Sequence, residues 1–279
     1  MVHRSQIAFA LVLFMNVLFV FHCPDLPAAE TGLIKPGDKV GIQFTCRFPN
    51  GEIAASSSIS VAKDSSLPKS VVFMPRSKDD PLEVTAGQGT RSSAFPVQFE
   101  DEIVARIAGS LPGMPLGEQR TIEIRSERSA DVPAKEQFVQ LALVRQRPKE
   151  LRVTRDSYKS RTGKDPEVGT AYIFDPLIPG KVASVSENEV LIRFSAQPGS
   201  VVETPFGKGT IRENGNQFEI VIDAVKGRLV RTGPVVGCIS DVQDRMFTID
   251  YGHPLGGQPL ACEVRTESIP GEKLSKKEE

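Results

Sequence analysis

Histidine and cysteine, two residue types common in catalytic and metal sites, are few in this sequence, and no familiar catalytic motif is present. The 279 residues include three histidines and four cysteines. There is no GxSxG, HExxH or P-loop motif, and no Cys/His group has the spacing of a metal site. We therefore expect neither a cofactor nor a metal ion. The residue types suit a binding protein, or an enzyme that needs no nucleophile.

One stretch near the C-terminal end combines several of the candidate residues. It runs from Ile249 to Leu260, where an alternating strand pattern leads into a turn with His253, Pro254 and a pair of glycines. A second apolar run follows the turn. We interpret this stretch as the point where an inserted unit returns the chain to the sheet of its host domain.

The composition is that of a globular protein with many short strands. Hydrophobic residues make up 39% and charged residues 25% of the chain, and the net charge is −1. This balance gives no reason to expect nucleic acid or an anionic membrane surface as a partner. Glycine (23) and proline (21) are plentiful and tryptophan is absent, which favours strands and turns. We expect a mainly β or α+β fold in one large or two small domains.

The first 29 residues differ from the rest of the chain. A basic start precedes an apolar run at residues 7–21, and the small residues Ala28 and Ala29 follow. This order is typical of a secretory signal peptide, so we expect export to a periplasmic or other extracytoplasmic compartment. The alternative is an uncleaved membrane anchor, because the run approaches the roughly 17 to 25 residues that span a bilayer. A charged tail, residues 271–279, ends the sequence.

Three cysteines follow the leader: Cys46, Cys238 and Cys262. In an oxidising compartment they allow one disulfide plus a free thiol, or no disulfide at all. Buried, small apolar side chains are the simpler interpretation of all three.

The front part, residues 30–150, predicts a small antiparallel sheet that wraps one helix. Apolar residues alternate from Val40 to Phe48, as in a strand with one buried face. Residues 54–70 show little periodicity and indicate a surface loop. Further strands are expected at residues 82–85 and 121–125. The helix has an acidic first turn and apolar residues at steps of four, namely Phe99, Ile103, Ile107 and Leu111.

The middle part, residues 151–246, contains a tandem repeat that closes in the stretch around His253. Each copy has a glycine, an isoleucine 11 or 12 residues later, and a second glycine seven residues after that. The three sets are Gly180, Ile192 and Gly199; Gly209, Ile220 and Gly227; and Gly237, Ile249 and Gly256. Each unit predicts a strand, a short polar turn and a second strand. Because an isolated hairpin is marginal in water, the copies should pack into one β-rich unit. Unrelated hairpins in one sheet are the alternative.

The segment that leads into the repeat is ambiguous. Residues 136–146 fit an alternating strand, with Val139, Leu141 and Leu143 on one face, and they also fit a helical face. The basic residues between Arg152 and Lys164 are interleaved with acids, which indicates a solvated face rather than a nucleic-acid site.

Several segments resemble FKBP-type peptidyl-prolyl isomerases, namely VGIQFTCRFPNGEIAASS, PLEVTAGQG, LPGMPLGEQ and RTIEI. The closing segment DYGHPLGGQPLACEV is similar to the SlyD-type branch, in which a chaperone domain is inserted into the FKBP fold. The resemblance covers residues 36–130 and 249–268. It implies a host domain made of residues 30–150 and 247–270. The repeat region, 151–246, would then be an expanded insert where the host's flap would be.

The resemblance also implies a pocket for a proline-containing peptide. Phe44 stands where the family often has tyrosine, the family's acidic position falls at Ala55, and two aromatic positions fall at Ala130 and Cys262. The other substrate-binding positions that it implies are Leu82, Leu111, Met114, His253, Leu255 and Leu260. A pocket without the acid and two rings should bind proline weakly, because each buried ring contributes about 1.5 to 3 kcal/mol.

These features predict an exported, SlyD-like FKBP protein that helps extracytoplasmic chains to fold. Prolyl isomerisation needs no cofactor, because an apolar pocket with a dipole aimed at the carbonyl lowers the rotational barrier. The expected partners are unfolded or proline-containing polypeptides, with a membrane involved only if the N-terminal segment stays uncleaved. The alternative function is that of a non-enzymatic peptide- or protein-binding scaffold that uses the hairpin-repeat insert.

Overall fold

The computed structural model describes residues 32–89, 95–130 and 132–269. The predicted signal peptide, residues 1–29, and the charged tail, residues 271–279, lie outside the described residues. Within the described ranges, no helix is long and apolar enough to cross a bilayer. Strands far outnumber helices in these ranges, and all the sheets are antiparallel, which confirms the prediction of a mainly β, α+β fold.

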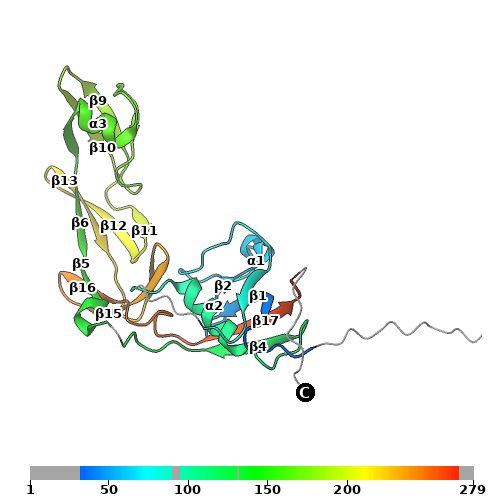
Figure 1. Cartoon of the computed structure of the whole chain (residues 1–279). Coiled ribbons are helices and arrows are strands. Elements are labelled where there is room, and N and C mark those ends of the chain that lie inside the picture. Colours follow the sequence, from blue (N-terminus) through cyan, green and yellow to red (C-terminus); the bar gives the residue numbers. More distant parts are fainter. Residues whose placement is uncertain (1–31, 90–94, 131, 270–279) are drawn as a thin grey trace, which may run out of the picture. The chain divides into compact units, whose positions relative to one another are not determined.

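The host sheet is built from strands that lie at both ends of the described sequence. Its order is β2 (Ile53–Ser56), β1 (Lys39–Arg47), β17 (Leu260–Glu267) and β4 (Gln119–Ile124), and β3 (Leu82–Thr85) also pairs with β1. In Figure 1, blue β1 and red β17 lie side by side, although more than two hundred residues separate Cys46 from Cys262. The host domain is therefore complete only after the chain has passed through everything between β4 and β17.

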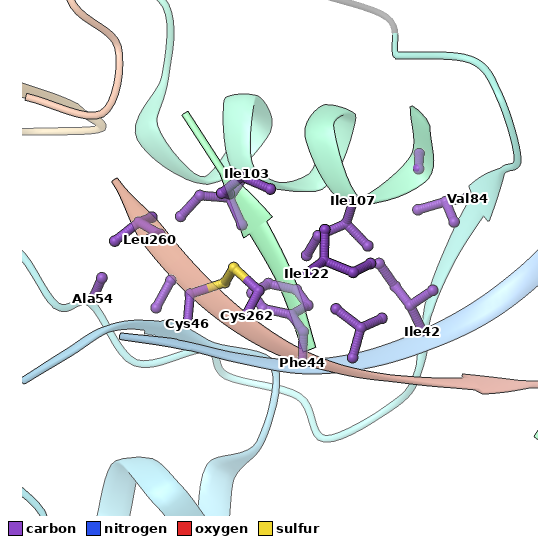
Figure 2. Close-up of a cluster of buried hydrophobic side chains, with 14 of the residues drawn as sticks. Ile42, Phe44, Cys46, Ala54, Val84, Ile103, Ile107, Ile122, Leu260 and Cys262 are labelled. Atoms are coloured by element: carbon purple, nitrogen blue, oxygen red, sulfur yellow. A yellow bond between two sulfur atoms is a disulfide. The ribbon is translucent and has the colours of Figure 1, made fainter. Parts of the chain in front are cut away.

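A single helix, α2 (Phe99–Ser110), packs on the inner face of this sheet. The alternating residues Val40, Ile42 and Phe44 of β1 are buried, as the period of two predicts. Ile103 and Ile107 of α2 point at the strands beneath the helix in Figure 2, and both are fully buried. The two periodic patterns thus meet in one core. The segment expected to be a loop contains β2 and the short helix α1 (Ile59–Lys63).

The region between β4 and β17 forms three four-stranded sheets, which we call the first, second and third modules. The first module contains β7 (Glu150–Thr154), β8 (Ala171–Tyr172), β9 (Gly180–Val185) and β10 (Glu189–Phe194), with α3 (Arg155–Thr162) after β7. The second contains β6 (Val144–Pro148), β11 (Val201–Thr204), β12 (Gly207–Asn214) and β13 (Gln217–Ile222). The third contains β5 (Phe138–Ala142), which follows the 3₁₀ turn Ala134–Gln137, with β14 (Leu229–Thr232), β15 (Val235–Val242) and β16 (Met246–Asp250).

Each repeat copy supplies the hairpin of one module, as the spacing predicts. Beside these hairpins, the consecutive strands β5, β6 and β7 each pair with one module, in reverse order of the repeats. The ambiguous segment before the repeat is therefore strand, because its backbone completes two sheets. The strands that pair within the modules run from Phe138 to Asp250, because β5, β6 and β16 all belong to them. This range is longer than the residues 151–246 expected from the sequence.

The first glycine of each repeat copy lies under a large side chain of the paired strand. A Cβ atom on Gly180 would lie 2.8 Å from the ring of Phe194, one on Gly209 would lie 2.7 Å from Ile220, and one on Gly237 would lie 2.8 Å from the ring of Tyr251. Real Cβ atoms essentially never approach so closely. These glycines recur because the hairpin packs a bulky residue directly against the backbone of its partner strand.

The second glycine of each repeat copy is hydrogen-bonded in the same way in the first two copies and differently in the third. The N–H groups of Gly199 and Gly227 each donate to the carbonyl of an isoleucine in the next hairpin, Ile211 and Ile239, at 2.8 Å. Gly256 instead donates to the carbonyl of His253 at 2.8 Å, within its own turn. The third copy departs from the repeat at this point because no further module follows, and the chain returns to the host sheet at β17.

Neighbouring modules share hydrophobic cores. One buried cluster joins Tyr158 and Ile192 of the first module to Ile220 of the second, and another joins Ile222 of the second to Ile249 of the third. The host core in turn includes Val236 and Leu255, which lie in or just after the third module. A four-stranded sheet has little core of its own, so each module depends on burial against its neighbour, as in other repeat proteins.

The host sheet is closed by a disulfide between Cys46 of β1 and Cys262 of β17 (Figure 2). The two residues are opposite one another in the strand register, and both are fully buried. Cys238 of β15 is a free, partly buried cysteine. The sequence allowed this pairing but favoured buried unpaired thiols, and the register of β1 against β17 decides in favour of the disulfide.

Candidate functional site

A cavity of about 540 Å³ lies between α2 and the strands β1, β2 and β3. Its apolar walls come from three places: Phe44 and Ala55 on the strands β1 and β2, Leu82 and Val84 on β3, and the helix face opposite. The full lining consists of Phe44, Ala55, Ser56, Met74, Arg76, Leu82, Glu83, Val84, Thr85, Gln88, Glu100, Asp101, Val104, Ala105 and Ala108.

Phe44 is held in place by hydrogen bonds between its backbone and two serines. Its N–H donates to Ser57 Oγ at 2.8 Å, and Ser56 Oγ donates to its carbonyl at 3.2 Å. Both serines are buried, so these bonds are shielded from water. Because they fix the end of β2 against β1, the ring of Phe44 and the small side chain of Ala55 form a continuous wall.

The helical wall is made of small or short side chains at Val104, Ala105 and Ala108. They are next to the core residues Ile103 and Ile107 in the sequence of α2, and residues of β3 line the cavity with them. Large side chains at these positions would fill the space between helix and sheet. The small side chains on this part of α2 therefore leave room for the cavity.

Charged groups gather at the rim of the cavity, around the first turn of α2. Glu100 accepts two hydrogen bonds from the guanidinium of Arg231 in β14, at 2.8 and 2.7 Å. Arg231 also donates to the carbonyl of Val72 at 2.6 Å, and its guanidinium lies 5.9 Å from the ring centre of Phe99. The third module is thus tied by an ion pair to a residue of the cavity rim.

Among the residues that the resemblance placed in the pocket, two line this cavity: Phe44 and Leu82. Ala55, at the family's acidic position, lines it as well. Four other apolar residues are fully buried in the host core and do not line the cavity: Leu111, Met114, Leu255 and Leu260.

The remaining positions lie away from the cavity. His253 is in the turn after the third module, where its buried Nδ1 has no hydrogen-bond partner within the described residues. Ala130 is exposed in the connection after β4, and Cys262 is in the disulfide. His253 therefore does not contribute to the wall of the cavity beside Phe44.

Sequence reasoning missed most of the helical wall. Val104, Ala105 and Ala108 lie inside the predicted helix, and the signal that could have found them is a run of small residues next to the apolar stripe. Met74 and Arg76 come from a segment without regular structure, for which periodicity gives no signal.

The chemistry available in the cavity is that of a binding site. Its polar side chains are hydroxyls, amides and charged groups at the rim, and no nucleophile is paired with a base among its lining residues. Across the described ranges, no group of three His, Cys, Asp or Glu residues could hold a metal ion. The arrangement can take up an apolar group, remove it from water and orient it by hydrogen bonds at the edge.

Comparison with models of known protein families finds no match, and a search among curated proteins finds no significant relative.

Proposed function

We propose that this chain is a SlyD-like, FKBP-type prolyl isomerase and folding helper that acts on extracytoplasmic polypeptides. The observation that carries the proposal is the apolar cavity beside Phe44, enclosed by one helix and three strands of a sheet whose segments resemble that family. The site would take a proline-containing segment of an unfolded chain.

Rotation about a prolyl peptide bond needs little more than such a cavity. The barrier of about 18 to 20 kcal/mol comes from the resonance of the planar amide, which also makes the planar form more polar than the twisted one. Transfer from water into apolar surroundings therefore favours the twisted form relative to the planar form. A hydroxyl of the lining, such as that of Thr85, would orient the chain.

The size of the cavity agrees with this role. Ligand sites commonly enclose about 300 to 1,000 Å³, and 540 Å³ holds a proline ring with its neighbouring side chain. The cavity has Phe44 without a phenolic hydroxyl, and Ala55 at the position of the family's acid. We therefore expect activity on short peptides to be modest, because two groups that would hold the substrate are missing.

The experiment is the rate of cis/trans exchange of a short Ala-Leu-Pro-Phe peptide, measured by NMR exchange spectroscopy with catalytic amounts of protein. The variant Val104→Phe should abolish the acceleration, because a benzyl group at this half-buried position occupies the cavity. Ser110→Phe is the matched control, since Ser110 is exposed at the end of the same helix and does not line the cavity.

If the wild-type protein at micromolar concentration does not accelerate cis/trans exchange of the peptide, the isomerase proposal is refuted. Equal activity in the wild type and in Val104→Phe would show that the cavity beside Phe44 is not the site.

A further inference from the structure

The first module of the insert contains a second cavity, of about 290 Å³. It is lined mainly by aromatic and aliphatic side chains of β7, β8, β10 and the segment after β8. The full lining consists of Arg147, Pro148, Leu151, Val153, Ser157, Arg161, Tyr172, Phe174, Asp175, Ile178 and Phe194. All of these residues belong to the first module or to the end of β6, so the cavity is separate from the one beside Phe44.

Two arginines stack on the aromatic wall of this cavity. The guanidinium carbon of Arg161 lies 4.4 Å from the ring centre of Phe174, and that of Arg147 lies 5.8 Å from it. Arg147 is neutralised, because its Nε donates to the largely buried carboxylate of Asp175 at 2.9 Å. Arg161 makes no ion pair with the described residues, so it leaves one positive charge at the mouth of the cavity.

The contact with Phe174 places the Arg161 charge beside the aromatic wall of the cavity. A guanidinium that lies over a ring keeps its N–H groups in its own plane, where they can still bind a carboxylate by two parallel hydrogen bonds. The site therefore offers an apolar recess and, next to it, a donor group held ready for a carboxylate. A compact ligand with an apolar group and a carboxylate would fill the recess and pair with Arg161 at the same time.

Exposed apolar side chains also flank β8 in the sequence. Val168, Ile173 and Phe174 are 67%, 72% and 43% exposed and belong to the segments on either side of β8. Exposed apolar side chains of this size are costly when they gather beside a recess, and such gatherings mark binding surfaces. Among the three, Phe174 also lines the cavity and so joins this exposed apolar surface to the recess.

We propose that this cavity binds the C-terminal end of a polypeptide, with an apolar last side chain in the recess and the terminal carboxylate on Arg161. The last residue of a chain places a side chain and a carboxylate on the same carbon atom, which suits an apolar cavity with Arg161 in its lining. The volume is at the lower limit for ligand sites, so it suits one large side chain rather than a longer segment. The preceding residues lie against Ile173 and Val168.

The site goes beyond the proposed isomerase activity and requires no proline. The insert would select chain ends, such as those of released or cleaved polypeptides, while the host cavity acts on prolyl bonds elsewhere in the same chain. A proline-free probe therefore keeps the two proposals separate, because its binding does not depend on whether the host cavity isomerises anything.

The experiment uses fluorescence anisotropy with the full chain and a fluorescein-labelled, proline-free octapeptide that ends in Leu-Phe. The peptide is compared in two forms, with a free C-terminal carboxylate and with a C-terminal amide. The amide should bind roughly tenfold to a hundredfold more weakly, as expected for loss of a charge-assisted hydrogen-bonded pair. The variant Arg161→Gln should bind the free-acid peptide more weakly by the same factor and bind the amide peptide as the wild type does. The variant should therefore no longer distinguish the two peptides.

Arg155→Gln is the matched control. Arg155 lies six residues before Arg161 on α3, is exposed, and does not line the cavity. It should keep the wild-type preference for the free acid.

Three outcomes would overturn the proposal. In the first, the wild type binds the free-acid and amide peptides equally well. In the second, Arg161→Gln still prefers the free-acid peptide as strongly as the wild type does. Either result would show that Arg161 does not bind the terminal carboxylate. In the third, 3-phenylpropanoate alone binds as tightly as the free-acid peptide, which would assign the cavity to small organic acids instead of polypeptide ends.

Discussion

The disulfide between Cys46 and Cys262 gives the sharpest test of how the host domain is held together. It joins β1 to β17, the two central strands that the insert separates in sequence. Phe44, in the wall of the candidate site, is two residues from one end of this link. We predict that the double variant Cys46→Ala/Cys262→Ala is strongly destabilised in the host domain.

The magnitude follows from the length of chain that the link closes. The two cysteines are 216 residues apart. In the chain-entropy model, a loop of this length restricts the unfolded chain by about 18 cal/mol/K, or about 5 kcal/mol at 25 °C. Typical domains have a total stability of about 5 to 15 kcal/mol, so this loss is a third or more of what holds the host folded.

The assay is urea unfolding, with protection of the β1 and β17 amides from hydrogen exchange as the readout for the host. Oxidised wild type is compared with the double variant and with the control Cys238→Ala. Cys238 is partly buried, and burial, helped by the nearby carboxylate of Asp250, raises the pKa of its thiol. It therefore stays protonated at neutral pH and does not attack the disulfide, so the control should change stability by about 1 kcal/mol or less.

Two results would refute the reasoning. Peptide mapping of the unreduced protein could fail to find the segments around Cys46 and Cys262 joined. The double variant could also lose no more stability than Cys238→Ala, which would mean that strand pairing and core packing alone hold the two halves of the host.

Two further predictions concern the insert and its contact with the host. Gly237→Ala should lose about 1 to 3 kcal/mol of stability, because the added methyl overlaps the ring of Tyr251. Gly109→Ala, which has open space around it, should gain about 0.5 to 1 kcal/mol. Denaturant unfolding measures both variants, and equal changes in stability would contradict the packing explanation. Arg231→Gln should lower the free energy of unfolding by about 1.5 to 3 kcal/mol and speed hydrogen exchange in the first turn of α2. Arg152→Gln breaks an ion pair in which both side chains are exposed, so it should lower the free energy of unfolding by at most about 1 kcal/mol. Similar losses in the two variants would show that the ion pair at the cavity rim has no special role.

Local patterns in the sequence were enough to predict most elements of the host, but not β2 and α1, which lie in the segment expected to be a loop. Alternation from Val40 to Phe48 gives β1, and apolar residues at steps of four from Phe99 give α2, because each pattern reports one face of one element against one core. The hairpins of the repeat were equally predictable, since their turns and their crowded glycines recur at fixed spacing. These features depend on contacts within a few residues or across one turn.

The cavity could be predicted only in part. Phe44 and Leu82 line it, but Leu111, Met114, Leu255 and Leu260 do not. A leucine carries the same apolar surface whether it fills a core or borders a cavity, so residue type alone does not separate the two. The helical wall depends on which side of α2 faces β3, and this follows from packing across the whole sheet.

The sequence by itself determined the mainly β class, the host helix and the three copies of the hairpin. The turn around His253 also indicated the return of the chain to the host. Tertiary structure alone decided that β5, β6 and β7 each complete one module, that β17 pairs with β1 after this return, and that Cys46 and Cys262 meet across these two strands. The reason is physical: strand pairing between segments far apart in sequence depends on the register of backbone hydrogen bonds, and neither periodicity nor composition carries that register.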